Sequence, residues 1–358
     1  MFISSKLFLN ELSKLSLKSP KTALLVSALL LLSSSWNVQA NGKKYRAGNC
    51  SDAIILLSEP LPAEPVMPVM PVIKYARPNL QMGDGKHAGP ANIWNPKKGF
   101  LVQSTNPGSY NLNFPTTGAD NLYFDLLITG IDVRELTWAP VSHEGITASV
   151  INVVPNDYWI PYEDRGQVVV RVKLTGPEAR NQRFKPSRIT VPRLPQTFEL
   201  VGRDKDGYEL VKYGFVLRKW FVNRVVTKYY NDQSAWCRGL GYRMPGVSDL
   251  TNTNCGVRGD HFFPCIKIKV GRDYIIMNDG AKPSSGHGEY QRQIGAGFFT
   301  EWGSMSSYAD AGFIGDSYWL GGSRSGDNMM LAVSSSKGYV YGRIDNFGGN
   351  YGLCLSGG

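Results

Sequence analysis

Four histidines are the side chains best suited to proton transfer near neutral pH, and two of them stand beside a carboxylate. His143 precedes Glu144 and His261 follows Asp260, so each pair holds the groups that general acid–base catalysis needs. No nucleophile elbow, His-Glu-x-x-His motif or paired-carboxylate motif accompanies them. We therefore expect no catalytic residues and no enzyme activity. The alternative is a secreted or periplasmic hydrolase whose site assembles from these four residues only in the fold.

The sequence also contains a short recognition motif, Arg258-Gly259-Asp260, between Cys255 and Cys265. A disulfide between these cysteines would hold the tripeptide in a tight, exposed loop, and a constrained loop loses less entropy on binding. The functional interpretation is integrin recognition. The alternative is chance, because a three-residue sequence arises often in a long chain.

Aromatic residues near the C-terminus form a further set of binding candidates. Trp302, Tyr318 and Trp319 could stack on a sugar ring or anchor a partner, as aromatic side chains do at binding hot spots. Alternatively, they fill the core. The candidate binding residues are therefore Arg258, Gly259, Asp260, Trp302 and Trp319. We expect no cofactor and no metal ion, because no Cys-x-x-Cys or His-x-x-x-His spacing supports zinc.

The first 40 residues have the pattern of a signal peptide. Lys14, Lys18 and Lys21 precede the apolar run Ala23–Leu32, and Val38-Gln39-Ala40 offers a cleavage site. The alternative, a membrane anchor that stays attached, needs about 20 apolar residues, and this run is shorter. Export implies an oxidising compartment, in which disulfides form and persist.

The charge pattern argues against nucleic acid as a partner. Residues 1–40 contribute four Lys against one Glu, so the net charge of the remaining chain falls from +10 to +7. The Lys and Arg residues are scattered among acids, and no dense basic stripe is visible. Mild attraction to acidic surfaces is all that this charge supports. With 42% hydrophobic and 11% aromatic residues, the chain is not disordered as a whole.

The organisation of the chain follows from composition and strand patterns. Residues 41–78 are a lead and a proline-rich linker, because six prolines between Glu59 and Pro78 favour an extended spacer. Residues 79–200 contain short strand-like runs separated by turn signals, and no window shows a helical apolar period. We predict an immunoglobulin-like β-sandwich here. Its best strands are 121–131, 147–153 and 167–174.

The last part, residues 201–358, combines helices, short strands and glycine-rich loops. A hairpin over Phe198–Leu217 turns at Asp206-Gly207. Asn231-Asp232 offers an N-cap to a helix that ends at Gly241, and a second helix follows at Val247–Leu250. Strands are expected at 220–227, 266–270, 274–277, 329–334, 338–345 and 351–355. Four cysteines in this part allow three pairings, and Cys50 stands alone.

Five motifs in this part resemble a known family. They are similar to the first helices, the central Tyr-Trp strand and the terminal strand of bacterial C-type-lectin-like domains, with which invasin and intimin adhesins end. The motifs are Ser234–Cys237, Gly241–Pro245, Val247–Leu250, Gly315–Trp319 and Asn350–Cys354. The resemblance implies that a mostly β chain ends in an α+β lectin-like domain.

The resemblance also implies a disulfide. In these domains the helix cysteine pairs with the C-terminal one, which corresponds to Cys237–Cys354, and with it we predict Cys255–Cys265. Calcium-dependent lectins use a Glu-Pro-Asn loop and a Trp-Asn-Asp triplet, and only Asp345-Asn346 loosely resembles the latter. We therefore expect no calcium-dependent sugar site.

The function that the resemblance implies is adhesion. With a short proline-rich lead ahead of its domains, the chain looks like the secreted enterobacterial exoproteins of the Zir type, which work with a separate intimin-like outer-membrane protein. We expect a virulence-related, non-catalytic binding protein that a Gram-negative bacterium exports through the periplasm. Its C-terminal domain would recognise an outer-membrane partner or a host-cell surface protein, with no nucleic acid bound and no membrane span after signal cleavage.

Overall fold

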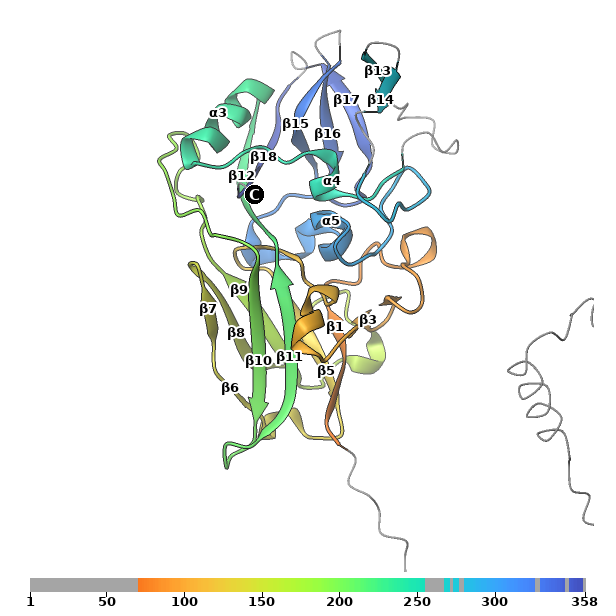
Figure 1. Ribbon diagram of the computed structural model, residues 1–358, viewed down its shortest axis with the longest axis vertical. Helices are drawn as coiled ribbons and strands as arrows, with labels where there is room; N and C mark the ends of the chain where they lie inside the picture. The colour runs from red at the N-terminus through yellow and green to blue at the C-terminus, as the bar shows by residue number, and fades with distance from the viewer. Residues whose placement is uncertain are drawn as a thin grey trace, which may run out of the picture. The chain divides into compact units, whose positions relative to one another are not determined.

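The computed structural model describes residues 70–254, 267–270, 273–276, 280–325, 329–344 and 348–356. Met67–Gly358 form one compact unit of the chain. Within the described ranges the chain is built from two modules, a β-sandwich followed by an α+β module (Figure 1). The predicted mostly β class, with a sandwich followed by an α+β domain, is confirmed.

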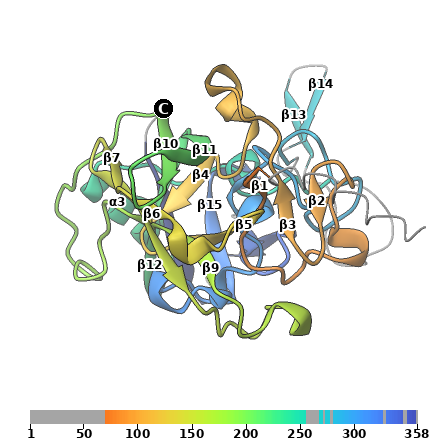
Figure 2. The ribbon, with the colours of Figure 1, turned by 90° about the horizontal axis from the view of Figure 1, so that it is seen from below.

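The sandwich consists of two antiparallel layers. The larger layer has seven strands in the order β2-β3-β1-β5-β9-β8-β7, and the smaller one has the order β11-β10-β6. Seen from below, β10 and β11 lie apart from β5 and β9 (Figure 2). The strands are β1 (Val72–Arg77), β2 (Trp94–Asn95), β3 (Gly99–Leu101), β5 (Tyr123–Thr129), β6 (Thr137–Trp138), β7 (Val141–His143), β8 (Ile146–Val153), β9 (Val169–Thr175), β10 (Gln196–Arg203) and β11 (Glu209–Leu217).

Alternation along these strands builds the core. On β5 and β11, Phe124 and Phe215 are fully buried, and their ring centroids lie 6.0 Å apart between the two layers. Burial of each such side chain stabilises the folded protein by about 1.5–3 kcal/mol. The strands predicted at 121–131, 147–153 and 167–174 are present as β5, β8 and β9. Short 3₁₀ turns lie between strands: Gly85–His87, Pro107–Leu112, Val133–Glu135 and Tyr162–Asp164.

The hairpin β10–β11 belongs to the sandwich. β10 pairs with β11 on one side and with β6 at Gly202 and Arg203 on the other. The expected boundary between residues 200 and 201 therefore falls inside a strand, and β1 lies within the expected linker. Hydrophobic and turn signals mark strands but do not tell which layer a strand joins. We propose that the two modules meet just after Leu217.

The α+β module is a six-stranded sheet in the order β17-β16-β15-β18-β12-β4. Figure 1 shows helix α3 beside β12 and β18. Its elements are β12 (Lys219–Lys228), α3 (Tyr230–Leu240), α4 (Val247–Leu250), α5 (Phe298–Trp302), two 3₁₀ turns (Met305–Ser307 and Ala309–Ala311), β15 (Ser317–Ser325), β16 (Met329–Ser334), β17 (Val340–Ile344) and β18 (Asn350–Leu355). A separate hairpin consists of β13 (Lys267–Val270) and β14 (Asp273–Ile276). Most of these elements lie within a few residues of their predicted positions.

Helix α3 departs from the prediction at its start. Its N-cap is Tyr229, whose side chain makes no capping hydrogen bond, so the predicted cap at Asn231-Asp232 is wrong. Tertiary contacts fix the first turn instead, because the buried Gln233 side-chain amide donates to the carbonyls of Val226 and Asn350. At the other end the prediction is confirmed. Gly241 has the left-handed conformation (φ 88°) that favours glycine after a helix.

A disulfide joins helix α3 to the last strand. Cys237 and Cys354 are bonded, their Cα atoms are 5.4 Å apart, and both side chains are completely buried. The pairing implied by the family resemblance is thereby confirmed. Cys50, Cys255 and Cys265 lie outside the described residues.

The first module contributes a strand to the second. β4 (Thr117–Ala119) leaves the sandwich and pairs in parallel with the start of β12. Beside it, Trp220 is completely buried, and its indole N–H donates to the Pro177 carbonyl. The two modules therefore share one sheet and are joined by main-chain hydrogen bonds as well as by side-chain packing.

Candidate functional site

Two of the predicted binding residues lie in the core. Trp302 and Trp319 are 0% exposed. The Trp302 indole N–H donates to the Thr117 carbonyl at 3.0 Å, and that of Trp319 donates to the Lys228 carbonyl at 2.9 Å. Buried, hydrogen-bonded indoles offer no face to a partner. The predicted binding role of both residues is wrong, and the alternative, that they fill the core, is correct. Arg258, Gly259 and Asp260 lie outside the described residues.

The His143–Glu144 pair lies in the tight turn between β7 and β8. The Glu144 carboxylate accepts two hydrogen bonds from the Arg193 guanidinium, at 2.7 and 3.0 Å, and these lower its pKa. The His143 ring packs edge-on against Phe198, with centroids 5.2 Å apart. This histidine and carboxylate are thus engaged with separate partners. Asp260 and His261, the other two residues of the hydrolase alternative, lie outside the described residues.

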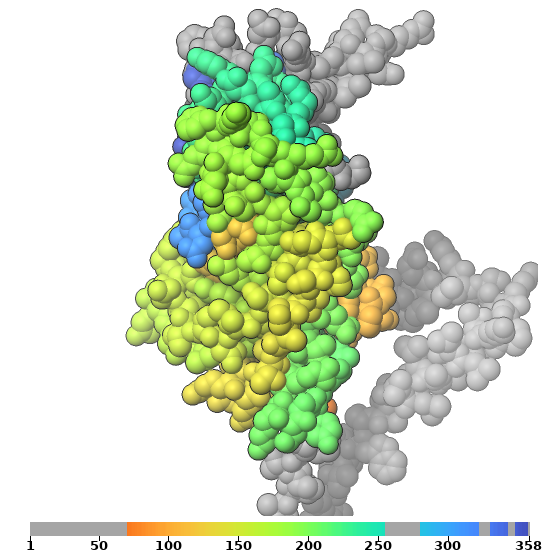
Figure 3. Space-filling view, turned by 90° about the vertical axis from the view of Figure 1, so that its left-hand side faces the viewer, coloured from red at the N-terminus to blue at the C-terminus, as the bar shows by residue number. Residues whose placement is uncertain are grey.

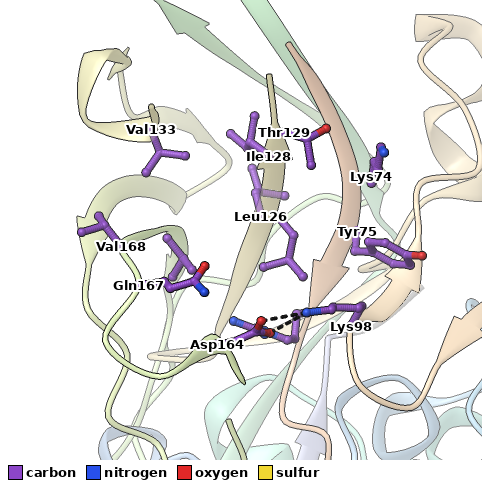
Figure 4. Close-up of a pocket in the computed structure, with 13 residues that line it drawn as sticks. Lys74, Tyr75, Lys98, Leu126, Ile128, Thr129, Val133, Asp164, Gln167 and Val168 are labelled. Atoms are coloured by element: carbon purple, nitrogen blue, oxygen red, sulfur yellow. Dashed lines mark hydrogen bonds and ion pairs between the residues drawn. The ribbon is translucent and has the colours of Figure 1, made fainter. Parts of the chain in front are cut away.

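The cavity in Figure 4 is lined by residues of β1, β5 and β9 and of the segments beside them. It has a volume of about 230 Å³, and its walls include Leu126, Ile128, Val133 and Val168. The Lys98 ammonium at its lower edge lies 2.7 Å from the Asp164 carboxylate. Burial raises the pKa of Asp164, but the cations Lys98 and Arg77 outweigh this effect and lower it. None of the residues that line the cavity is a serine, cysteine or histidine.

A histidine–carboxylate cluster joins the two modules. The imidazole Nε2 of His87 lies 2.9 Å from the Glu289 carboxylate, and its Nδ1 lies 2.9 Å from the Tyr290 carbonyl. The Lys86 ammonium lies 3.0 Å from the same carboxylate, and the His287 ring is 6.3 Å from that of His87. His87 and Glu289 are more than 200 residues apart, so no sequence pattern shows this cluster. Its geometry holds the 3₁₀ turn at residues 85–87 against the second module.

Burial lowers the pKa of His87 below the ordinary value of 6.5, although Glu289 opposes the shift. The unfolded chain then binds a proton at a higher pH than the folded protein does. Stability should therefore be complete above pH 6.5 and should fall as the pH drops through that value towards the lowered pKa. We expect the melting temperature to decrease between pH 7 and pH 5, and to decrease less in His87→Gln. Differential scanning calorimetry across this range measures both. Equal pH slopes in the two proteins would contradict the assignment.

Two buried ionic side chains, Glu301 and Arg292, also connect the two modules. The Glu301 carboxylate is 0% exposed and accepts hydrogen bonds from the backbone N–H groups of Thr116, Thr117 and Gly295. It also accepts from the hydroxyl groups of both threonines. Thr116 and Thr117 lead into β4, and Glu301 lies on α5, so one carboxylate spans the module boundary. Burial raises the pKa of Glu301.

Arg292 forms the second connection. Its guanidinium, 0% exposed, donates to the carbonyls of Asn79, Gln81, Met82 and Glu301 at 2.7–3.2 Å. The planar guanidinium carries five donors, which suits it to a cluster of carbonyl groups. Both connections are sealed from solvent. They therefore hold the scaffold in place and do not contact a ligand.

The surface most suited to contact with a partner is formed by the loop 178–193 and helix α3. Figure 3 shows this loop beside the helix on one face of the molecule. Three main-chain carbonyl groups of the loop accept hydrogen bonds from side chains of the α+β module. Trp236 donates to Gln182, Arg224 to Arg183 and Tyr242 to Thr190, each at 2.7 Å. The loop is thereby anchored to the disulfide-linked module, while many of its side chains are exposed.

An aromatic ring and several cations project from this loop. Phe184 is 74% exposed, and Arg183, Lys185 and Arg188 around it are also exposed. Between Glu178 and Glu199 the sequence contains five Lys or Arg residues and no Asp or Glu. A charge count over windows of this length would have found the segment, so the expectation that basic residues are merely scattered is wrong here. We call Arg183, Phe184, Lys185 and Arg188 the basic face.

Within the ranges that the structure covers, no group of three or more His, Cys, Asp and Glu side chains is arranged to hold a metal ion. No described helix combines the length and apolarity needed to cross a membrane. These statements concern only the described part of the chain.

Comparison with known proteins finds similarity to solved structures only. No family model matches the chain, and no curated protein matches it. The crystal structure of invasin, a bacterial integrin-binding protein, is 13% identical with a TM-score of 0.42, and 80% of this chain covers 39% of that one. An intimin–Tir90 complex is 10% identical with a TM-score of 0.39, covering 80% of this chain and 98% of that one. An intimin mutant from EHEC O157:H7 is 12% identical with a TM-score of 0.35, covering 74% and 92%. The chain thus spans well under half the length of the invasin structure.

Proposed function

We propose that this chain is an exported, non-catalytic binding protein, whose C-terminal α+β module recognises a protein on the bacterial outer membrane or on a host cell. The Cys237–Cys354 disulfide carries the proposal. The motifs that resemble the family follow one another along the chain in the order helix, Tyr-Trp strand and terminal strand. A bond between the first and last of these motifs, with the Tyr-Trp strand β15 beside β18, agrees with that resemblance.

The connections within the fold, which make a rigid scaffold, support the same function. A protein that binds at a surface benefits from a rigid scaffold that presents loops to a partner. Here the second module is closed by a disulfide and is joined to the sandwich by a shared sheet, by Glu301 and by Arg292. Of the four residues in the hydrolase alternative, the structure describes two: His143 packs against Phe198, and Glu144 is hydrogen-bonded to Arg193.

A binding assay tests this function directly. Fluorescently labelled protein comprising residues 41–358 is incubated with intact Gram-negative bacteria and, separately, with cultured epithelial cells. We expect saturable retention on one of the two cell types that is abolished when the cells are first treated with protease, because the proposed partner is a protein. The isolated label serves as the control. Absence of saturable retention on both cell types would refute the proposal.

The integrin hypothesis for Arg258-Gly259-Asp260 is tested within the same assay. Asp260→Glu keeps the charge but lengthens the side chain by one methylene, which disturbs a tightly fitted carboxylate site. If the tripeptide binds an integrin, this variant should lose at least about tenfold in affinity for epithelial cells, equal to about 1.4 kcal/mol. Unchanged retention would favour the chance occurrence.

A further inference from the structure

We infer that the basic face binds an acidic polypeptide segment of the partner, with Phe184 packing against an apolar side chain of that segment. This inference rests on the proposed function and adds the contact surface and its chemistry. The basic face comprises Arg183, Phe184, Lys185 and Arg188 of the loop, and it borders helix α3 (Figure 3).

The first support is uncompensated charge. Among the described residues, no acidic side chain forms an ion pair with Arg183, Lys185 or Arg188, whereas the neighbouring Arg180 is paired with Asp120 and Glu178. Three exposed cations within six residues attract anions and speed association with an acidic surface. Arginine also forms bidentate hydrogen bonds with carboxylates. The basic face therefore complements a segment rich in Asp and Glu.

The second support is a groove at the foot of the loop. It is lined by Phe184, Pro186, Arg224, Lys228, Asp232, Ala235 and Trp236, and its volume is about 440 Å³. Of these lining residues only Asp232 is acidic, and Arg224 and Lys228 add positive charge. Apolar and cationic side chains line the same groove. This composition suits an extended peptide that presents both carboxylates and an apolar side chain.

The third support is the exposed aromatic ring. An isolated ring that is 74% exposed costs solvation free energy, and aromatic residues together with arginines are enriched at the centres of protein interfaces. The backbone on either side of Phe184 is fixed, because the carbonyl of Arg183 accepts from Arg224 and Pro186 packs against the backbone of Gly239. Little backbone conformational entropy is therefore lost when the ring is covered.

Two synthetic polymers test the chemistry. Immobilised poly-L-glutamate and a random copolymer of glutamate and tyrosine are compared by biolayer interferometry with residues 41–358. We expect the protein to bind both, with affinity that falls as salt is raised, and to bind the copolymer several-fold more tightly. Phe184→Ser should abolish that preference. Tyr208→Ser, which changes a ring that is 71% exposed at the β10–β11 turn, should retain it.

Charge reversal tests the location. The triple variant Arg183→Glu, Lys185→Glu, Arg188→Glu should lose about tenfold or more in affinity for both polymers. A control with the same net charge, Arg165→Glu, Lys205→Glu, Arg218→Glu, changes three exposed cations elsewhere and should stay within about twofold of the wild type. Equal losses in the two triple variants would overturn the inference. Tighter binding through the same residues to heparin or to phosphatidylglycerol vesicles would overturn it as well, in favour of a polysaccharide or a lipid surface.

The cell assay separates this inference from the proposed function. If the basic-face variant is retained on cells as well as the wild type is, the inference fails and the proposed function stands. If the wild type itself is not retained on any cell, the proposed function fails, whatever the polymers show.

Discussion

Glu301→Ala should lower the free energy of unfolding by about 3–5 kcal/mol, as expected when the buried partner of a charged hydrogen-bond network is removed. The five donors that now point at this carboxylate come from Thr116, Thr117 and Gly295. In the alanine variant they remain buried with a cavity in front of them. Each unsatisfied donor costs about 1–3 kcal/mol before the structure relaxes. Urea denaturation measures the loss as a lower midpoint.

Two further variants make this prediction specific. Glu301→Gln keeps the volume and one accepting oxygen, but its amide places a donor against other donors, so we expect an intermediate loss. Glu135→Ala removes an exposed glutamate and should change stability by less than about 0.5 kcal/mol. If Glu301→Ala were as stable as Glu135→Ala, the carboxylate would not hold the modules together.

Loss of Glu301 should also change how the protein unfolds. Because α5 and β4 meet at this carboxylate, a variant without it is expected to separate unfolding of the sandwich from that of the α+β module. Two transitions by calorimetry, in place of one, would show this loss of cooperativity. We expect the wild type to unfold in a single transition, because Glu301 joins the two modules.

The elements of this fold were predictable where local signals are strong. Asp206-Gly207 marks the β10–β11 turn and Gly241 ends α3; runs rich in Val, Ile, Leu and aromatic residues mark β5 and β9, and alternation of polar and apolar residues marks β8. Each of these signals acts over a few residues and needs no knowledge of distant contacts. The resemblance carried by the order of the motifs then predicted the Cys237–Cys354 disulfide.

The connections between modules were not predictable in this way. Glu301 lies more than 180 residues from Thr116, and Arg292 lies more than 200 residues from three of its four carbonyl partners. Threonine, glutamate and arginine are mostly exposed in proteins, so the sequence would place these residues on the surface. Only the fold shows that they are buried and paired. The same reasoning explains why Trp302 and Trp319 were misassigned, since a tryptophan in sequence looks alike on a surface and in a core.

The basic face is a different case, because its signal is local. A run of 20 residues without Asp or Glu, between Glu178 and Glu199, stands in the sequence. A charge count over the whole chain does not reveal this run, because acidic residues elsewhere offset its positive charge. What the sequence does not show is that the run is fixed to the α+β module through Trp236, Arg224 and Tyr242, so that its cations stay together on one face.

Removal of the Cys237–Cys354 disulfide should have the second large effect on stability. The two cysteines are 117 residues apart, and closing a loop of about 100 residues lowers the conformational entropy of the unfolded chain by an amount worth about 4–5 kcal/mol. We expect Cys237→Ala with Cys354→Ala to unfold at a much lower urea concentration than the wild type. Wild type treated with reductant should approach the variant, and reductant should shift the midpoint of the variant far less.

The bond also connects stability to the proposed function, since it joins the helix beneath the basic face to the end of the chain. With α3 no longer tied to β18, the hydrogen bond from Trp236 on α3 loses its fixed base, and the loop 178–193 should become more mobile. Hydrogen exchange of the loop amides should accelerate in the double variant at urea concentrations where it remains folded. Exchange as slow as in the wild type would show that the loop is held independently of the disulfide, and the rigid-scaffold argument for binding would then rest on the shared sheet alone.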